Sequence, residues 1–108
     1  MPSSVFLGEF EQLVLLALLQ LGDQGYALPL RRLMNEIAGR SISRGALYRT
    51  LDRMEQKGYV DWDIEEDVEG RGGHPRRRFF VTPSGLSAVR ASRAALLELW
   101  SGLEEILR

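Results

Sequence analysis

The chain has 108 residues and no cysteine, and its formal net charge is −1 at pH 7. This length allows one modest hydrophobic core, and the lack of cysteine excludes disulfides, thiolate metal sites and cysteine nucleophiles. With 44% hydrophobic and 27% charged residues, the composition is that of an ordinary soluble globular protein. The N-terminus has no signal-peptide pattern and the longest apolar run is too short to span a bilayer, so we expect a cytoplasmic protein.

Three helices are predicted in the first half of the chain. A nearly continuous apolar run predicts the first helix at Glu9–Leu21, and an i, i+3, i+4, i+7 apolar stripe predicts the second at Ala27–Ala38, ending at Gly39. The third helix, Ser43–Lys57, has serine at its N-cap position, and Gly58 ends it. Because the turn between the second and third helices is so short, the two are predicted to form a helix-turn-helix.

The second half of the chain predicts a hairpin and a long helix. Apolar and acidic residues alternate from position 60 to 65, which is typical of a half-buried strand, and a Gly-rich loop follows at 67–75. A returning strand is predicted at Arg77–Val81, and Thr82 followed by Pro83 marks the start of a helix that runs nearly to Arg108. This order predicts a mainly α (α+β) fold, with a winged helix-turn-helix domain over residues 1–81 and a C-terminal dimerisation helix over residues 82–108.

The positive charge is concentrated in two windows, residues 40–57 and 71–78. Together they hold nine basic and two acidic residues, a net charge of +7, whereas acidic residues dominate positions 61–69. Because DNA binding depends on local positive charge, the two windows predict a DNA-binding surface if they share a face. The alternative is that these charges are scattered and solvated.

The third helix carries the candidate base-reading residues. Its apolar positions face the core, so Arg49 and Arg53 point the opposite way. A recognition helix presents its N-terminal half to base edges, and arginine can bind guanine through two hydrogen bonds. Arg49 is therefore predicted to read bases, and Arg53 to contact a base or a phosphate. Residues near the helix N-terminus are predicted to meet DNA phosphates or to let another backbone approach closely: Ser43, Arg44, Tyr48 and Gly45.

Arg71 and Arg76 are predicted to contact DNA from the hairpin. The acidic residues of the opposite strand, Asp61, Asp63 and Glu65, are placed to neutralise Arg76 and Arg78, and we expect Arg76 to be freer for DNA than Arg78.

The sequence does not indicate an enzyme, a metal site or a cofactor. The Gly-rich segment at 70–73 lacks the strand–loop–helix context of a phosphate-binding loop. His74 is the single histidine, which with no cysteine leaves no metal-ligand set, and no nucleophile–base arrangement is visible.

The last helix carries an apolar series spaced alternately by three and four residues, interrupted by Arg93. A domain of this size cannot cover so long an apolar helix, so a homodimer is predicted. The residues predicted to form its interface are Leu86, Val89, Leu96, Trp100, Leu103 and Leu107. A sharper alternative is that Trp100 lines a pocket for a hydrophobic small-molecule effector between the subunits.

Several short motifs together resemble the PadR family of bacterial transcriptional regulators. They are Gly25-Tyr26, Gly45-Ala46-Leu47-Tyr48 with Leu51, Glu55 and Gly58, the segment 73–80 from Gly73 to Phe80, and the segment 81–85 from Val81 to Gly85. The single C-terminal helix resembles the short subclass, whose members dimerise through that helix and the first. The resemblance implies a repressor that binds a pseudo-palindromic operator, with Tyr48 on the DNA backbone.

The chain departs from the family pattern at two places. Phe79 and Phe80 stand where the family usually has tyrosine, and drug-sensing members carry their interfacial tryptophan about where Leu96 stands. The tryptophan departure counts against drug sensing, while the acidic overall charge would suit a protein-binding module. Two alternatives to a simple repressor stay open. One is a winged-helix module that binds proteins, and the other is a ligand-sensing regulator.

Overall fold

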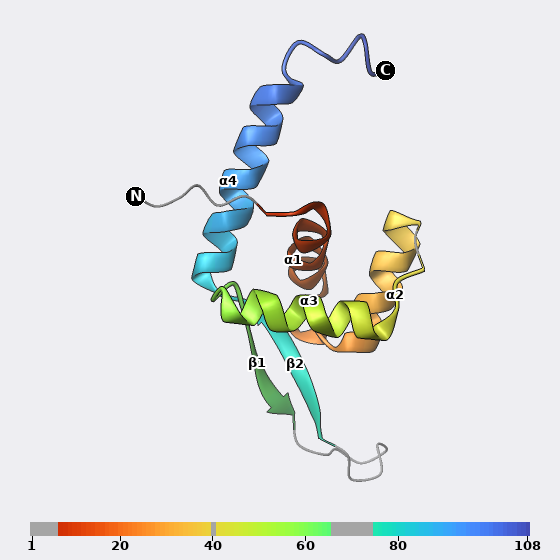
Figure 1. Ribbon diagram of the computed structural model, residues 1–108, viewed down its shortest axis with the longest axis vertical. Coiled ribbons are helices and arrows are strands. Elements are labelled where there is room, and N and C mark those ends of the chain that lie inside the picture. The colour runs from red at the N-terminus through yellow and green to blue at the C-terminus, as the bar shows by residue number, and fades with distance from the viewer. Residues whose placement is uncertain (1–6, 40, 66–74) are drawn as a thin grey trace.

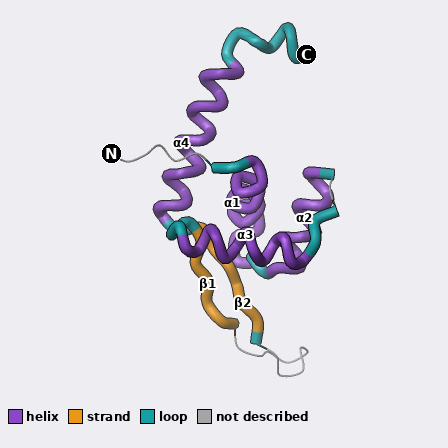
Figure 2. Tube along the Cα trace, in the orientation of Figure 1, coloured by secondary structure: helices purple, strands orange, loops and turns teal. Residues whose placement is uncertain are grey.

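The computed structural model describes residues 7–39, 41–65 and 75–108 of the chain. Helices α1, α2 and α3 form a compact body from which the hairpin β1–β2 and the helix α4 extend in opposite directions (Figure 1). Figure 2 shows helix and strand along the same trace. The elements in chain order are α1 (Glu9–Leu21), the short 3-10 helix η1 (Gly22–Gln24), α2 (Ala27–Ala38), α3 (Arg44–Gln56), β1 (Val60–Glu65), β2 (Arg76–Val81) and α4 (Pro83–Trp100).

The helix starts and stops follow capping chemistry that is local in the sequence. The Ser43 hydroxyl accepts a hydrogen bond from the backbone N–H of Ala46 at 3.1 Å, and the Thr82 hydroxyl accepts one from Gly85 at 3.0 Å. Gly39 ends α2 in the left-handed conformation, with φ at +67°. These contacts confirm the predicted end of the second helix and the predicted starts of the third and fourth helices.

The core lies where α1, α2 and α3 meet the inner face of the hairpin. Leu47, Leu51 and Met54 of α3 are buried in this core, which confirms the predicted core-facing side of that helix. The largest fully buried side chains of the core are Phe79, Leu15, Leu30, Leu47, Leu51, Met54, Val14 and Val60. Burial of these side chains is the main term that holds the helix-turn-helix together, at roughly 1.5–3 kcal/mol for each large apolar side chain.

The hairpin is joined to the helical body by close backbone contacts. Strands β1 and β2 are antiparallel, with Val60 opposite Val81 and Glu65 opposite Arg76. The Phe79 N–H donates to the carbonyl of Gly25 at 2.8 Å. A Cβ atom at Gly25 would lie 2.2 Å from the Phe79 carbonyl oxygen, so only glycine fits there without a shift of the backbone.

The last helix is shorter than the sequence predicts, because α4 ends at Trp100 rather than near Arg108. Ser101 is extended, with φ −59° and ψ 130°, and Gly102 has φ at +83°. Such a positive φ suits glycine and cannot continue a right-handed helix. Leu103 and Leu107 therefore lie beyond α4 on a segment of turns, and the heptad spacing is helical only as far as Trp100.

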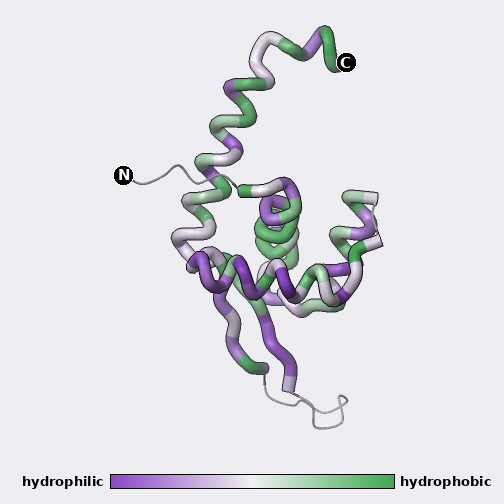
Figure 3. The backbone as a smooth tube through the Cα atoms, in the orientation of Figure 1, coloured by the Kyte–Doolittle hydropathy of each residue, from purple (hydrophilic) through white to green (hydrophobic). Residues whose placement is uncertain are grey.

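The outer part of α4 extends away from the body of the protein, and hydrophobic residues recur along it (Figure 3). Leu96, Leu97, Leu99 and Trp100 are all exposed. Among the described residues, no helix is both long and apolar enough to cross a membrane.

Candidate nucleic-acid interface

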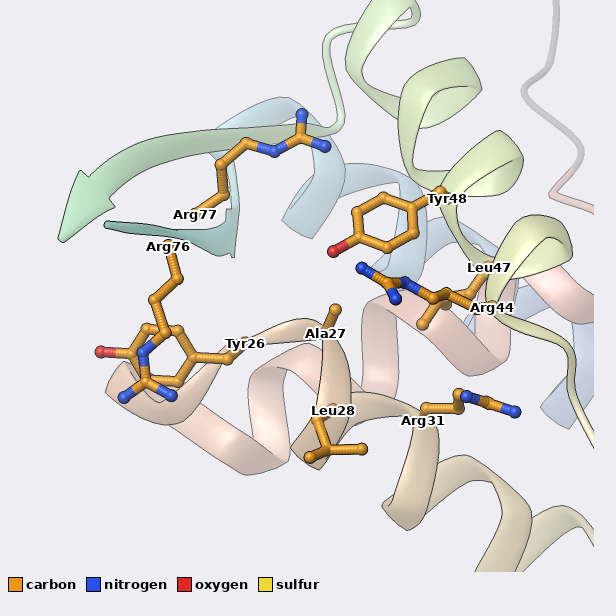
Figure 4. A pocket seen from close by; sticks show the side chains of 9 residues that line it. All are labelled: Tyr26, Ala27, Leu28, Arg31, Arg44, Leu47, Tyr48, Arg76 and Arg77. Atoms are coloured by element: carbon orange, nitrogen blue, oxygen red, sulfur yellow. The ribbon is translucent and has the colours of Figure 1, made fainter. Parts of the chain in front are cut away.

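A cleft of about 340 Å³ opens where the starts of α2 and α3 face the hairpin (Figure 4). It is lined by Tyr26, Ala27, Leu28, Arg31, Arg44, Leu47, Tyr48, Arg76 and Arg77. Four of these nine residues are arginines and none is acidic. Arg44 of the first basic window and Arg76 and Arg77 of the second therefore meet at one surface.

Of the predicted contact residues at the start of α3, Arg44 and Tyr48 line this cleft. Ser43, Arg44, Gly45 and Arg49 are exposed, and Tyr48 is half-buried. Gly45 has open space beside it, since a Cβ atom there would meet only the end of the Arg49 side chain, at 3.3 Å from Nη1. The structure thus leaves room for another molecule to approach the backbone at Gly45.

Arg31 and Asn35 of α2 hold the turn that sets the direction of α3. The Arg31 Nε donates to the Ile42 carbonyl at 2.6 Å, and the Ile42 N–H donates to the Asn35 side-chain oxygen at 2.9 Å. Ile42 is itself buried. These bonds fix the start of α3 relative to α2.

Arg53 is drawn towards α1 instead of lying with the cleft residues. Its Nε is 3.6 Å from a carboxylate oxygen of Glu11, and it also donates to the Thr50 hydroxyl at 3.3 Å. Glu11 is only 6% exposed and receives a further bond from Lys57 at 2.9 Å. The predicted DNA contact of Arg53 therefore competes with a buried carboxylate that the sequence analysis did not single out.

Arg76 is tied into a triad with Tyr26 and Glu65. Its Nε is 3.1 Å from a Glu65 oxygen, and its guanidinium lies 3.6 Å above the Tyr26 ring. The Tyr26 hydroxyl donates to the other Glu65 oxygen at 2.6 Å. This hydrogen bond to the carboxylate holds the pKa of Tyr26 above its ordinary value.

Arg78 pairs with Asp63 at 3.3 Å, and this bond holds the pKa of Arg78 above its ordinary value. Charge pairing across the hairpin is therefore confirmed. Arg76 has an acidic partner as Arg78 does, and the expectation that Arg76 is freer for DNA than Arg78 stays a prediction. Arg71, Gly70–Gly73 and His74 lie outside the described residues.

Arg77, like Arg31, lines the cleft although it was not among the predicted DNA-binding residues. Its guanidinium lies 5.4 Å from the Tyr48 ring, 5.0 Å from Trp62 and 5.2 Å from Phe79. The signal that would have found it is the alternation of a strand, which puts Arg77 on the same side of β2 as the buried Phe79.

The predicted dimerisation residues fall into two groups. Leu86 and Val89 are partly buried in the chain's own structure, whereas Leu96 and Trp100 are 43% and 50% exposed. A groove of about 370 Å³ lies between α1 and α4, lined by Gln12, Leu16, Val89, Arg93, Leu96, Leu97 and Trp100.

Within the described residues, no cluster of histidine and acidic side chains could hold a metal ion.

The family model that matches the chain and several solved structures similar to it belong to the same protein family. The family model of the "Transcriptional regulator PadR-like family" matches residues 15–91. No curated protein sequence matches the chain significantly.

Solved structures of similar fold include a PadR-like transcription factor from Bacteroides fragilis, which is 25% identical with a TM-score of 0.71 over 90% of this chain and 88% of that one. A PadR family regulator from Eggerthella lenta is 27% identical, with a TM-score of 0.65 over 93% and 87% of the two chains. A PadR family regulator from Clostridium difficile, 19% identical, has a TM-score of 0.72 over 94% and 100%. The predicted winged-helix fold is confirmed, and the chain belongs to the PadR-like family of transcriptional regulators rather than to an enzyme family.

Proposed function

We propose that this protein binds a pseudo-palindromic operator as a homodimer and represses transcription from it. The observation that carries the proposal is the cleft at the start of α3, where Arg44 of α3 and Arg77 of β2 come together with no acid among the lining residues. Guanidinium groups bind phosphate through paired hydrogen bonds, and their charge displaces counterions from DNA.

The exposed face of α3 fits the major groove. Arg49 projects from the helix opposite Leu47 and Leu51, both buried, where it can reach a guanine edge. Ser43, Arg44 and Tyr48 border the same end of the helix, and the free N–H groups there favour an anion. In this arrangement Arg49 reads sequence while its neighbours hold the backbone.

A second copy of the chain would cover the exposed part of α4. The residues of α4 that are exposed in the single chain continue the groove between α1 and α4. A two-fold dimer would present two α3 helices to one side of the duplex, so half-sites about one helical turn apart, or a multiple of it, are expected. A dimer bound over a promoter would exclude RNA polymerase without any further contact, which is why we propose repression.

Selection of bound DNA from a random pool tests the proposal. We expect an enriched two-fold symmetric sequence, and binding to it should fall steeply with salt. If the dimer neutralises about six to ten phosphates, the slope of log K against log salt is roughly −5 to −9. No enriched sequence and a slope near zero would contradict the proposal and favour a protein-binding module.

The groove between α1 and α4 supports one further candidate function, the sensing of a hydrophobic effector. Its lining is mostly apolar and includes the exposed Trp100. A flat apolar ligand there would quench the Trp100 fluorescence and change the affinity for DNA. Titration of a hydrophobic cationic dye against the wild type and the Trp62→Phe variant separates the Trp100 signal from that of Trp62.

A further inference from the structure

The three consecutive arginines of β2 differ in what neutralises them. Arg76 is paired with Glu65 and Arg78 with Asp63, so each of these two cations has a carboxylate beside it. Arg77 points to the other side of the strand. Among the described residues of the chain, it forms no ion pair with a carboxylate. Of the three, Arg77 therefore keeps an uncompensated positive charge.

Aromatic rings position Arg77 without neutralising it. Tyr48, Trp62 and Phe79 all lie within 5.4 Å of its guanidinium. The Phe79 ring is buried and lies edge-on to Tyr48, 6.4 Å between the ring centres, so the rings form one packed group. Cation–π contacts restrict the arginine while its N–H donors stay available to an anion.

Arg77 shares the Tyr48 ring with Arg44 of α3. The Arg44 guanidinium is 5.8 Å from the centre of that ring, and Figure 4 shows Tyr48 between the two guanidinium groups. Both arginines line the cleft and come from different elements. An anion at the open edge of Tyr48 would therefore face one cation from the recognition helix and one from the hairpin.

We propose that Arg77 and Arg44 bind the DNA backbone phosphates beside Tyr48, and that Arg76 is a positioning residue that fixes the hairpin through Tyr26 and Glu65. This inference rests on the proposed function, since it names which residues of the same site hold the duplex. It reverses the role that the sequence alone assigns to Arg76.

The test compares the variants Arg77→Gln, Arg44→Gln and Arg76→Gln by fluorescence anisotropy on a random-sequence duplex at several salt concentrations. Each phosphate contact contributes about 0.9 to the salt slope, and a dimer loses two contacts per substitution. Arg77→Gln and Arg44→Gln should each make the slope less steep by about 1.8. Arg76→Gln should leave the slope unchanged but speed amide hydrogen exchange in β1 and β2.

The Arg77→Lys variant separates charge from folding, because it keeps the cation and should restore most of the slope. An Arg76→Gln variant that flattens the slope as much as Arg77→Gln would overturn the assignment, as would an Arg77→Gln variant with the wild-type slope. If Arg77→Gln does not fold, as judged by circular dichroism, Arg44→Gln and Arg77→Lys decide the question. Failure of the wild-type protein to bind any duplex would instead refute the proposed function.

Discussion

At the scale of single residues, Glu11 joins α1 to the end of α3. Its carboxylate accepts hydrogen bonds from the Gly8 N–H at 3.1 Å and from Lys57 at 2.9 Å, with Arg53 at 3.6 Å. Burial by itself would raise the pKa of Glu11, but the bonds from Lys57 and Gly8 and the positive charges of Lys57 and Arg53 lower it below its ordinary value. The ionised carboxylate is therefore the form that stabilises the fold.

Glu11→Gln should lower the free energy of unfolding at pH 7 by about 1–3 kcal/mol, because charged hydrogen bonds are lost in a buried site. The folded pKa lies below 4.5, so this stabilisation is complete above about pH 4.5 and is lost as the pH falls through the folded pKa. Urea unfolding at several pH values measures it. Glu36→Gln, at an exposed position of α2, is the control and should change little. A difference between wild type and Glu11→Gln that persists in acid would contradict this account.

Arg49 is the residue whose loss should change specificity. Arg49→Ala should weaken operator binding by about 1–3 kcal/mol per half-site and random-DNA binding much less, because one bidentate base contact per half-site is lost. Titration of both duplexes with wild type and variant measures the two losses. Arg90→Ala, which removes an exposed arginine of α4, is the matched control. Equal losses on both duplexes would show that Arg49 holds the backbone instead of reading bases.

At the scale of elements, two kinds of glycine occur. Some are required because another part of the chain packs against them, and one has open space beside it that a partner could occupy. At Gly25 and Gly85 an added Cβ would lie 2.2 Å from the backbone oxygens of Phe79 and Tyr59. These glycines let the hairpin and α4 approach their neighbours. Gly45 lies in the first turn of α3, where an added Cβ would meet only a flexible arginine end. The fold therefore does not need a glycine at position 45.

Gly45→Ala should stabilise the protein by up to about 1 kcal/mol, because alanine has the higher helix propensity. The same variant should bind the operator more weakly if a DNA backbone approaches that position. Gly25→Ala is the contrasting variant, with an expected loss of about 1–3 kcal/mol or more from overpacking. Thermal unfolding and operator titration are measured on both. Unchanged operator affinity in Gly45→Ala would remove the case for close approach at this point.

At the scale of the whole molecule, α4 is the element that a single chain leaves uncovered. Leu96→Lys combined with Trp100→Lys should give monomers in sedimentation velocity, because two charges would be buried in the proposed interface. Ala91→Lys, on the opposite side of the heptad spacing, should leave the dimer intact. Leu103→Lys should have the weaker effect, since Leu103 lies beyond the end of α4. Persistence of the dimer in the double variant would place the interface elsewhere.

The sequence by itself determined the elements and their order. Helix periodicity, the Ser43 and Thr82 caps and the alternation of β1 are local signals, and the structure confirms α1, α2 and the core face of α3. The motifs that resemble the PadR family identified the family correctly. The sequence also predicted that basic residues are concentrated on α3 and β2, because each of the two basic windows is a continuous segment of the chain.

Only the tertiary structure decided which of the arginines have a carboxylate partner and which do not. Tyr26 and Glu65 are 39 residues apart and Glu11 and Lys57 are 46 apart, so no local pattern reveals that these pairs meet. Those contacts occupy Arg76 and draw Arg53 towards α1, whereas the pleat of β2 turns Arg77 towards the rings of Tyr48, Trp62 and Phe79. Whether a charge counted in the sequence has a carboxylate partner depends on which distant side chains the fold brings together.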